Sequence, residues 1–167
     1  MHIHRSQTGF TYLALLFMVA TMGATLALTG HLWQKTMQQE KERQLLFVGN
    51  QFRRAILLYY ERTPGLVKQY PKQLTDLIKD NRYPSIQRYL REIYVDPITG
   101  KKEWGLIQAP EGGIMGIHST SVSKPQKIGN FNGQYESFNN SLRYSDWKFI
   151  YRPNAVENMQ TNLMHIK

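Results

Sequence analysis

The chain has 167 residues and no cysteine, which excludes a disulfide framework, a thiolate metal site and a cysteine nucleophile. Once a short leader and a long apolar segment are set aside, the remaining length is enough for one small domain. The 21 basic and 12 acidic residues give a net charge of +9. Such a surface suits phosphates, lipid headgroups or acidic partner subunits. No basic cluster interleaved with aromatic residues and no nucleic-acid-binding signature is present, so we favour acidic partner subunits over nucleic acid.

The N-terminal region combines a polar leader, residues 1–9, with an apolar segment, residues 10–33. No Asp, Glu, Lys or Arg occurs between Ser6 and Gln34. A run of about 20 apolar residues is long enough to cross a bilayer as a helix. We therefore expect residues 10–33 to be a transmembrane or filament-core helix. A secretory signal is cut after its apolar segment, whereas the candidate cleavage point here, between Gly9 and Phe10, precedes it.

The helical pattern continues beyond the apolar segment through residues 34–62. Good helix formers follow Trp33, and Pro64-Gly65 is a stop signal. Apolar residues recur at a spacing of three and four, which predicts one stripe along a helix that another part of the chain must cover. The stripe consists of Leu45, Val48, Phe52, Ala55 and Tyr59. We predict a single helix over residues 10–62.

Residues 63–152 are expected to form an αβ-loop and a small β-sheet. Ser85 is a candidate N-cap for a short helix over residues 86–93, and Pro97 and Gly100 indicate a turn. Strands are predicted at residues 103–107, 114–118 and 147–151, the last presenting an aromatic face of alternating residues. The predicted fold class is α+β, a long N-terminal helix packed against a small antiparallel sheet. Residues 153–167 are expected to be a flexible tail.

Catalytic motifs are absent from the sequence, so we expect no enzymatic activity. There is no phosphate-binding loop, no HExxH and no nucleophile elbow. The run from Gly112 to Gly116 resembles a phosphate loop only in its glycine content, because no helix signal follows it. We interpret it as a hairpin turn that enters a strand.

The sequence at the start of the apolar segment is Gly9-Phe10-Thr11-Tyr12-Leu13-Ala14-Leu15-Leu16-Phe17. This run resembles the class III leader of the type IV pilin and type II secretion pseudopilin superfamily. The resemblance implies cleavage between Gly9 and Phe10 by a prepilin peptidase and methylation of the new amino group of Phe10. It also implies a pilin-like fold and a single-pass inner-membrane protein, with a cytoplasmic N-terminus and a periplasmic domain.

The function that this resemblance implies is that of a pseudopilin, a structural subunit of a periplasmic type II secretion-like pseudopilus. The implied partners are other pseudopilins, the prepilin peptidase, the inner-membrane assembly platform and, before assembly, membrane lipid. The family usually has glutamate at the fifth mature position, which is Ala14 here, and members that lack it tend to be minor or tip-located. We therefore expect a minor subunit. The alternative is a minor type IV pilin that binds DNA for uptake or serves adhesion.

Calcium is the one cofactor that the resemblance raises, because major pseudopilins bind it in a loop before their last strand. Calcium needs six to eight oxygen ligands, usually including several carboxylates. The corresponding loop offers only Glu136 and Asp146, with Asn139 and Asn140. We therefore predict no metal cofactor and keep Glu136 and Asp146 as weak calcium candidates.

Overall fold

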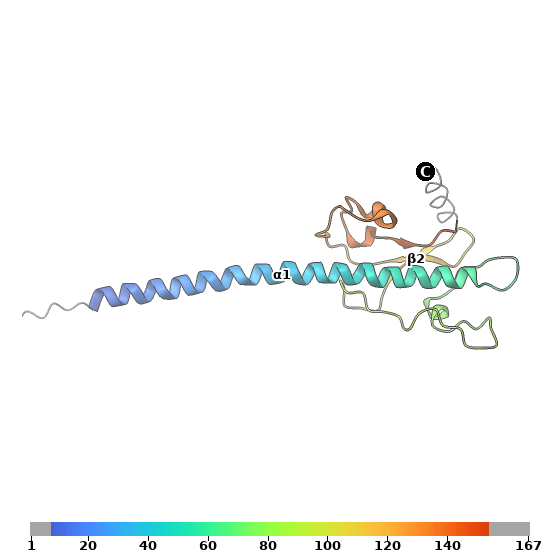
Figure 1. Cartoon of the computed structure of the whole chain (residues 1–167), viewed down its shortest axis with the longest axis horizontal. Coiled ribbons are helices and arrows are strands. Elements are labelled where there is room, and N and C mark those ends of the chain that lie inside the picture. Colours follow the sequence, from blue (N-terminus) through green and yellow to red (C-terminus); the bar gives the residue numbers. More distant parts are fainter. Residues whose placement is uncertain (1–7, 154–167) are drawn as a thin grey trace, which may run out of the picture. The chain divides into compact units, whose positions relative to one another are not determined.

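A computed structural model describes residues 8–153, apart from the side chains of residues 8–9 and 24–34 (Figure 1). The leader up to residue 7 and the tail from residue 154 lie outside the described residues. The chain divides into two compact units, Met1–Glu40 and Lys41–Lys167. The elements, in chain order, are helix α1 (Thr8–Glu61), the 3₁₀ turn η1 (Leu74–Leu77), strands β1 (Gly105–Gln108) and β2 (Ile114–His118), the 3₁₀ turns η2 (Gly133–Phe138) and η3 (Tyr144–Asp146), and strand β3 (Phe149–Ile150).

The first unit consists of the N-terminal part of α1. The helix begins at Thr8, two residues before the predicted start, and in the second unit it ends at Glu61, close to the predicted stop. In the part of the chain that the structure describes, no helix is long and apolar enough to cross a membrane. Thr11, Thr21 and Gly23 dilute the apolar run. The expectation of a membrane-spanning segment, and with it the single-pass inner-membrane location with a cytoplasmic N-terminus and a periplasmic domain, is therefore wrong.

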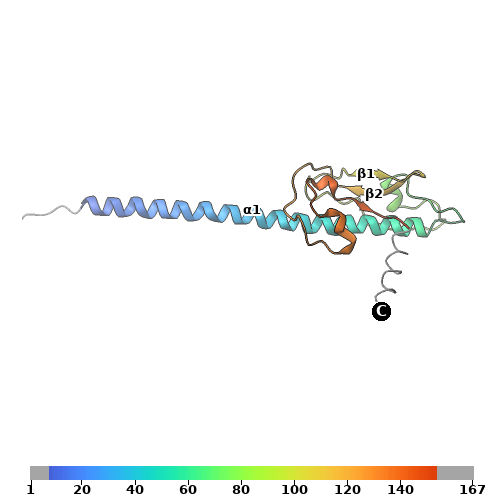
Figure 2. The same ribbon diagram turned by 90° about the horizontal axis from the view of Figure 1, so that it is seen from above.

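The second unit is an α+β domain with a small antiparallel sheet. The strand order is β1-β2-β3, and both pairs are antiparallel. Leu106 lies opposite Ile117, and Ile117 lies opposite Phe149. The register shifts between Ile107 and Gln108, next to the β1–β2 turn. Figure 2 shows β1 and β2 alongside the C-terminal part of α1.

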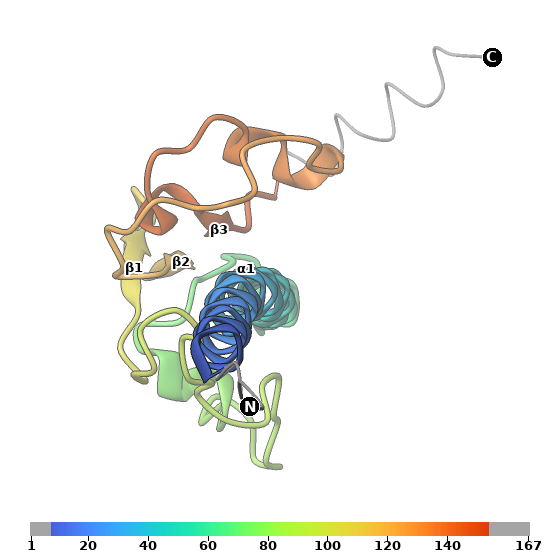
Figure 3. The ribbon, with the colours of Figure 1, turned by 90° about the vertical axis from the view of Figure 1, so that its left-hand side faces the viewer.

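Two layers cover the C-terminal part of α1. The sheet lies on one side, and the segment of residues 74–104 lies on another (Figure 3). The sheet approaches the helix so closely that a Cβ atom on Gly49 would be 2.4 Å from the ring of Phe149. Real Cβ atoms are essentially never so close to another side chain, so glycine is the residue that permits this contact. This contact positions β3 directly on the helix.

The short helix predicted over residues 86–93 is wrong. Its backbone donors bond to another part of the chain instead of to each other: Tyr89 N–H and Leu90 N–H both donate to the carbonyl of Leu77, each at 2.9 Å. Asp80 and Gln87 form an isolated antiparallel bridge. These long-range bonds satisfy the backbone in an extended conformation, so the helix has no advantage there.

The three predicted strands are present: β2 has the predicted bounds, residues 114–118, and the ends of β1 and β3 are shifted. β1 begins two residues later than predicted, and β3 is limited to Phe149 and Ile150. Trp147 belongs to the preceding turn, because its backbone N–H donates to the carbonyl of Tyr144 at 3.1 Å. The β-pairing continues beyond β3 through the N–H of Tyr151, which donates to the carbonyl of Met115 at 2.9 Å.

Candidate functional site

The N-terminal site residues all lie in the first turns of α1. Gly9 and Phe10 are helical, and the side chain of Phe10 is exposed. The leader residues before Thr8 are outside the described part of the chain, so of the predicted leader the structure covers only Thr8 and Gly9. Ala14 lies one turn further along and is also exposed.

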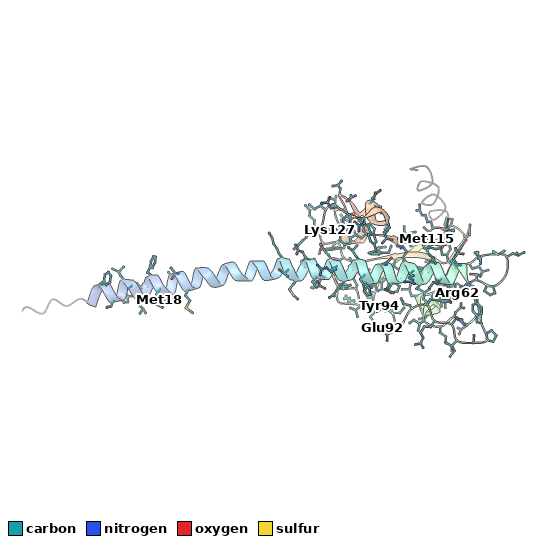
Figure 4. All side chains as sticks on the ribbon, viewed as in Figure 1. Met18, Arg62, Glu92, Tyr94, Met115 and Lys127 are labelled. Carbon is teal, nitrogen blue, oxygen red and sulfur yellow. The ribbon has the colours of Figure 1, made fainter. Side chains whose placement is uncertain are left out.

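Large apolar side chains cover this part of α1 on every side and remain exposed. Their exposed fractions run from 49% to 79%. Figure 4 shows them projecting from the helix around Met18. The residues are Phe10, Tyr12, Leu13, Leu15, Leu16, Phe17, Met18, Val19 and Met22. We name this stretch, residues 10–22, the exposed apolar segment. Contiguous apolar surface on this scale marks a site of interaction.

The five residues of the predicted packing stripe lie in the core of the second unit. Leu45, Val48, Phe52, Ala55 and Tyr59 are between 0% and 8% exposed. The ring of Phe52 packs edge-on against Tyr94, with centroids 6.2 Å apart, and against Trp104 at 5.3 Å. The chain's own sheet and loops therefore cover this face, and it is not a surface for other subunits.

A buried carboxylate, which the sequence reasoning missed, fixes the long segment of residues 119–146 to α1. Glu42 is 4% exposed, and one of its oxygens accepts hydrogen bonds from Gln126 N–H at 2.6 Å and from the Tyr144 hydroxyl at 2.7 Å. The N–H of Lys127 approaches the other oxygen at 3.3 Å. One signal in the sequence points to this role: Glu42 lies three residues before Leu45, on the same face as the packing stripe.

The segment of residues 119–146 is folded around its own aromatic cluster. The ring of Trp147 stacks on Phe138 at 5.6 Å and packs edge-on against Phe131 and Tyr144. The indole N–H of Trp147 is buried without a hydrogen-bond partner among the described residues. Arg53 of α1 adds a second attachment, because its guanidinium donates to Gln134.

The C-terminal end of α1 is capped by a partly buried ion pair. Arg82 bonds to both oxygens of Asp80, at 2.9 and 2.7 Å, and donates to the carbonyl of Tyr59 at 3.0 Å and the hydroxyl of Thr63 at 2.8 Å. Burial alone would raise the pKa of Asp80, but these hydrogen bonds lower it below its usual value. Burial and a hydrogen bond to Asp80 raise the pKa of Tyr89 to about 12. Since Arg82 satisfies the carbonyl of Tyr59 in the last turn of the helix, this network is structural.

The two calcium candidates, Glu136 and Asp146, lie on separate turns, η2 and η3. Glu136 is exposed on η2, and an oxygen of Asp146 accepts the N–H of Arg143 at 3.0 Å within the turn of η3. Among the described residues, no group of three or more His, Cys, Asp or Glu side chains gathers in one place. These residues do not fit the oxygen-rich coordination that calcium requires.

A hollow of about 460 Å³ lies between residues 67–72 and the β1–β2 turn. Lys68, Lys72 and Glu111 line it together with Gly112 and Gly113. The turn has the conformation of a hairpin, since Gly112 and Gly113 have φ angles of 91° and 84°. The lining brings together no pair of nucleophile and base, so it offers no catalytic constellation.

Comparison with protein-family models, with curated proteins and with solved structures found no match for this chain. The evidence for the candidate surfaces therefore comes from the residues of the chain and their geometry. Among the described residues, the exposed apolar segment of α1 holds nine exposed large apolar side chains within 13 consecutive residues.

Proposed function

We propose that this protein is a minor structural subunit of a pseudopilus-like filament, of the pseudopilin kind found in type II secretion. The observation that supports the proposal is the exposed apolar segment of α1, whose large side chains point to all sides of the helix. A helix that is apolar all round needs apolar surroundings on every side. In a filament, the corresponding helices of neighbouring subunits supply these surroundings.

The energetics favour such packing. Full burial of one large apolar side chain contributes about 1.5–3 kcal/mol, and the segment holds nine of them. Helices with side chains of this size pack with their axes about 8–10 Å apart. The second unit has a core of its own along the packing stripe. It therefore needs no neighbour in order to fold, and it would decorate the filament surface.

Residues at the start of α1 give the proposal its finer features. The resemblance to pseudopilins supports cleavage between Gly9 and Phe10 by a prepilin peptidase, followed by methylation of Phe10. It also supports a minor role, because Ala14 supplies no carboxylate to pair with a neighbouring subunit's amine. A minor subunit of this kind assembles with other pseudopilins and forms no filament alone.

Cross-linking through introduced cysteines tests the proposal, because the chain has no cysteine of its own. Phe17→Cys places a thiol in the exposed apolar segment, and Leu66→Cys places one on the fully exposed loop after α1. In native cells, a short bis-maleimide should join Phe17→Cys chains with a cysteine introduced at the equivalent helix position of neighbouring filament subunits. The Leu66→Cys control should give far less product. A chain that gives no cross-link at position 17 contradicts the proposed assembly.

A further inference from the structure

Six acidic side chains of the second unit accept hydrogen bonds from backbone N–H or hydroxyl groups of the same chain or from a guanidinium, and three of the six, Glu42, Asp80 and Asp96, are buried. The six are Glu42, Glu61, Asp76, Asp80, Asp96 and Asp146. Asp96, for example, is fully buried and accepts the Ser119 hydroxyl at 2.6 Å. Because Glu42, Asp80 and Asp96 are buried, and only Asp80 is paired with a basic residue, the surface of the unit is more basic than the net charge of the chain suggests.

Basic and apolar side chains share one face of α1 in this unit. Arg43, Phe47, Arg54 and Leu58 follow each other at intervals of four, seven and four residues. These intervals return to the same side of an α-helix. The side chain of Phe47 is 61% exposed, both arginines are exposed, and Leu58 is partly exposed. We name these four residues the Arg43–Leu58 face.

This face is turned away from the rest of the unit. The packing stripe, which lies in the core, occupies the opposite side of the helix. In Figure 3 the sheet lies above and to the left of α1, the segment of residues 74–104 lies below it and to the left, and no other described segment is drawn directly to the right of the helix. Glu61, three residues after Leu58, is exposed and accepts the Tyr151 hydroxyl at 2.5 Å.

We propose that the Arg43–Leu58 face binds an acidic amphipathic helix of a different protein chain. The inference rests on the proposed function in taking this chain to be a neighbouring filament subunit. Phe47 and Leu58 supply the apolar centre that a helix-in-groove contact uses, and Arg43 and Arg54 supply charge complementarity at its sides.

A second copy of this protein fits the face poorly. Identical copies would bring two basic surfaces together, and like charges at an interface are repulsive. Nucleic acid fits less well than an acidic helix, because phosphate groups contact the arginines but do not bury the apolar side chains of Phe47 and Leu58. Both remain distinct outcomes of the experiment.

Binding of designed peptides to the full-length chain tests the proposal. The chain is kept in a nonionic detergent, which covers the exposed apolar segment. The probes are fluorescent helical peptides of about 18 residues, with leucines on one face and glutamates beside them, a twin with lysines in place of the glutamates, and a single-stranded DNA of similar length. The variant is Arg43→Glu with Arg54→Glu. The matched control, Arg88→Glu with Arg91→Glu, makes the same charge change at two other exposed arginines.

The expected result is that the glutamate peptide binds, that the Arg43→Glu/Arg54→Glu variant loses about tenfold in affinity, and that the control loses less than about threefold. Affinity should fall as salt rises, because the flanking charges are screened. Equal binding of the two peptides, equal losses in both variants, or no binding overturns the proposal. Tighter binding of DNA that depends on these arginines also overturns it, as does self-association in sedimentation that the variant abolishes.

The peptide-binding experiment and the cross-linking experiment on filament assembly can each reject one proposal without rejecting the other. Peptide binding without any cross-link at position 17 would retain the acidic partner and reject the filament. A cross-link at position 17 without peptide binding would retain the filament and reject the acidic helix.

Discussion

Replacing Glu42 tests whether one buried carboxylate holds residues 119–146 on the helix. In Glu42→Ala, the hydroxyl of Tyr144 and the N–H groups of Gln126 and Lys127 lose their acceptor. Tyr144 is fully buried, so its hydroxyl has no route to water, whereas Gln126 and Lys127 are exposed residues. A buried donor left without a partner costs about 1–3 kcal/mol. With the partial loss at the two backbone donors, we expect Glu42→Ala to destabilise the chain by about 2–4 kcal/mol.

Urea unfolding followed by tryptophan fluorescence measures this loss, because Trp147 packs against Tyr144 with centroids 5.4 Å apart. Hydrogen exchange should show faster exchange of the Gln126 amide in the same variant. A double-mutant cycle of Glu42→Ala with Tyr144→Phe should give a coupling of about 1.5–3 kcal/mol, the range for a hydrogen bond to a charged group. The control Glu103→Ala, at an exposed position, should change stability by less than about 0.5 kcal/mol.

Two results would refute this reasoning about Glu42. One is a loss below about 1 kcal/mol in Glu42→Ala, which would mean that water replaces the carboxylate. The other is unchanged exchange of the Gln126 amide, which would mean that the segment of residues 119–146 stays in place without its acceptor.

Three further predictions concern the core and the cap of the helix. Phe52→Ala should lower the free energy of unfolding in urea by about 3–5 kcal/mol, because the side chain is fully buried. Phe47→Ala, at an exposed position, should lower it by less than about 0.5 kcal/mol. Similar losses in the two variants would show that both side chains meet the same environment. Gly49→Ala should lower the melting temperature, because the added methyl group overpacks against the ring of Phe149 at a cost of about 1–3 kcal/mol. This cost outweighs the gain of about 1 kcal/mol in helix propensity. A higher melting temperature would mean that the ring of Phe149 moves aside. The folded-state pKa of Tyr89, about 12, lies above the ordinary value of 10.0, so its contribution to stability is present below pH 10 and lost as pH rises toward 12. Alkaline unfolding should therefore be less steep in Tyr89→Phe than in the unaltered chain, and identical pH profiles would contradict the hydrogen bond to Asp80.

The sequence by itself was sufficient for the long helix and its buried face. The spacing of Leu45, Phe52 and Tyr59 repeats with the period of a helix, and Pro64 stops the pattern close to the observed end of α1. The alternation of Phe149 and Tyr151 likewise indicated which side of the last strand is buried. Such patterns are reliable because they depend only on the local geometry of one element.

Hydropathy read along the chain was less reliable. The same apolar run that predicted a membrane-spanning helix contains Thr11, Thr21 and Gly23, and the described part of α1 does not reach the length and apolarity required. The sequence indicated an apolar helix, but it did not determine whether lipid or protein surrounds that helix.

Only the tertiary structure decided the roles of the polar residues. Glu42 accepts a hydrogen bond from the N–H of Gln126, 84 residues further along the chain. The position of Glu42 beside the packing stripe indicates that its carboxylate is buried, but it does not indicate which donors the carboxylate meets. The same holds for Asp96 with Ser119, and for Leu77, whose carbonyl takes the backbone donors that would otherwise have formed a helix over residues 86–93. A hydrogen bond depends on the distance and angle between two groups. The distance and the angle become defined only when the chain has packed. They decide which charged groups are buried in hydrogen bonds within the fold and which lie on the surface.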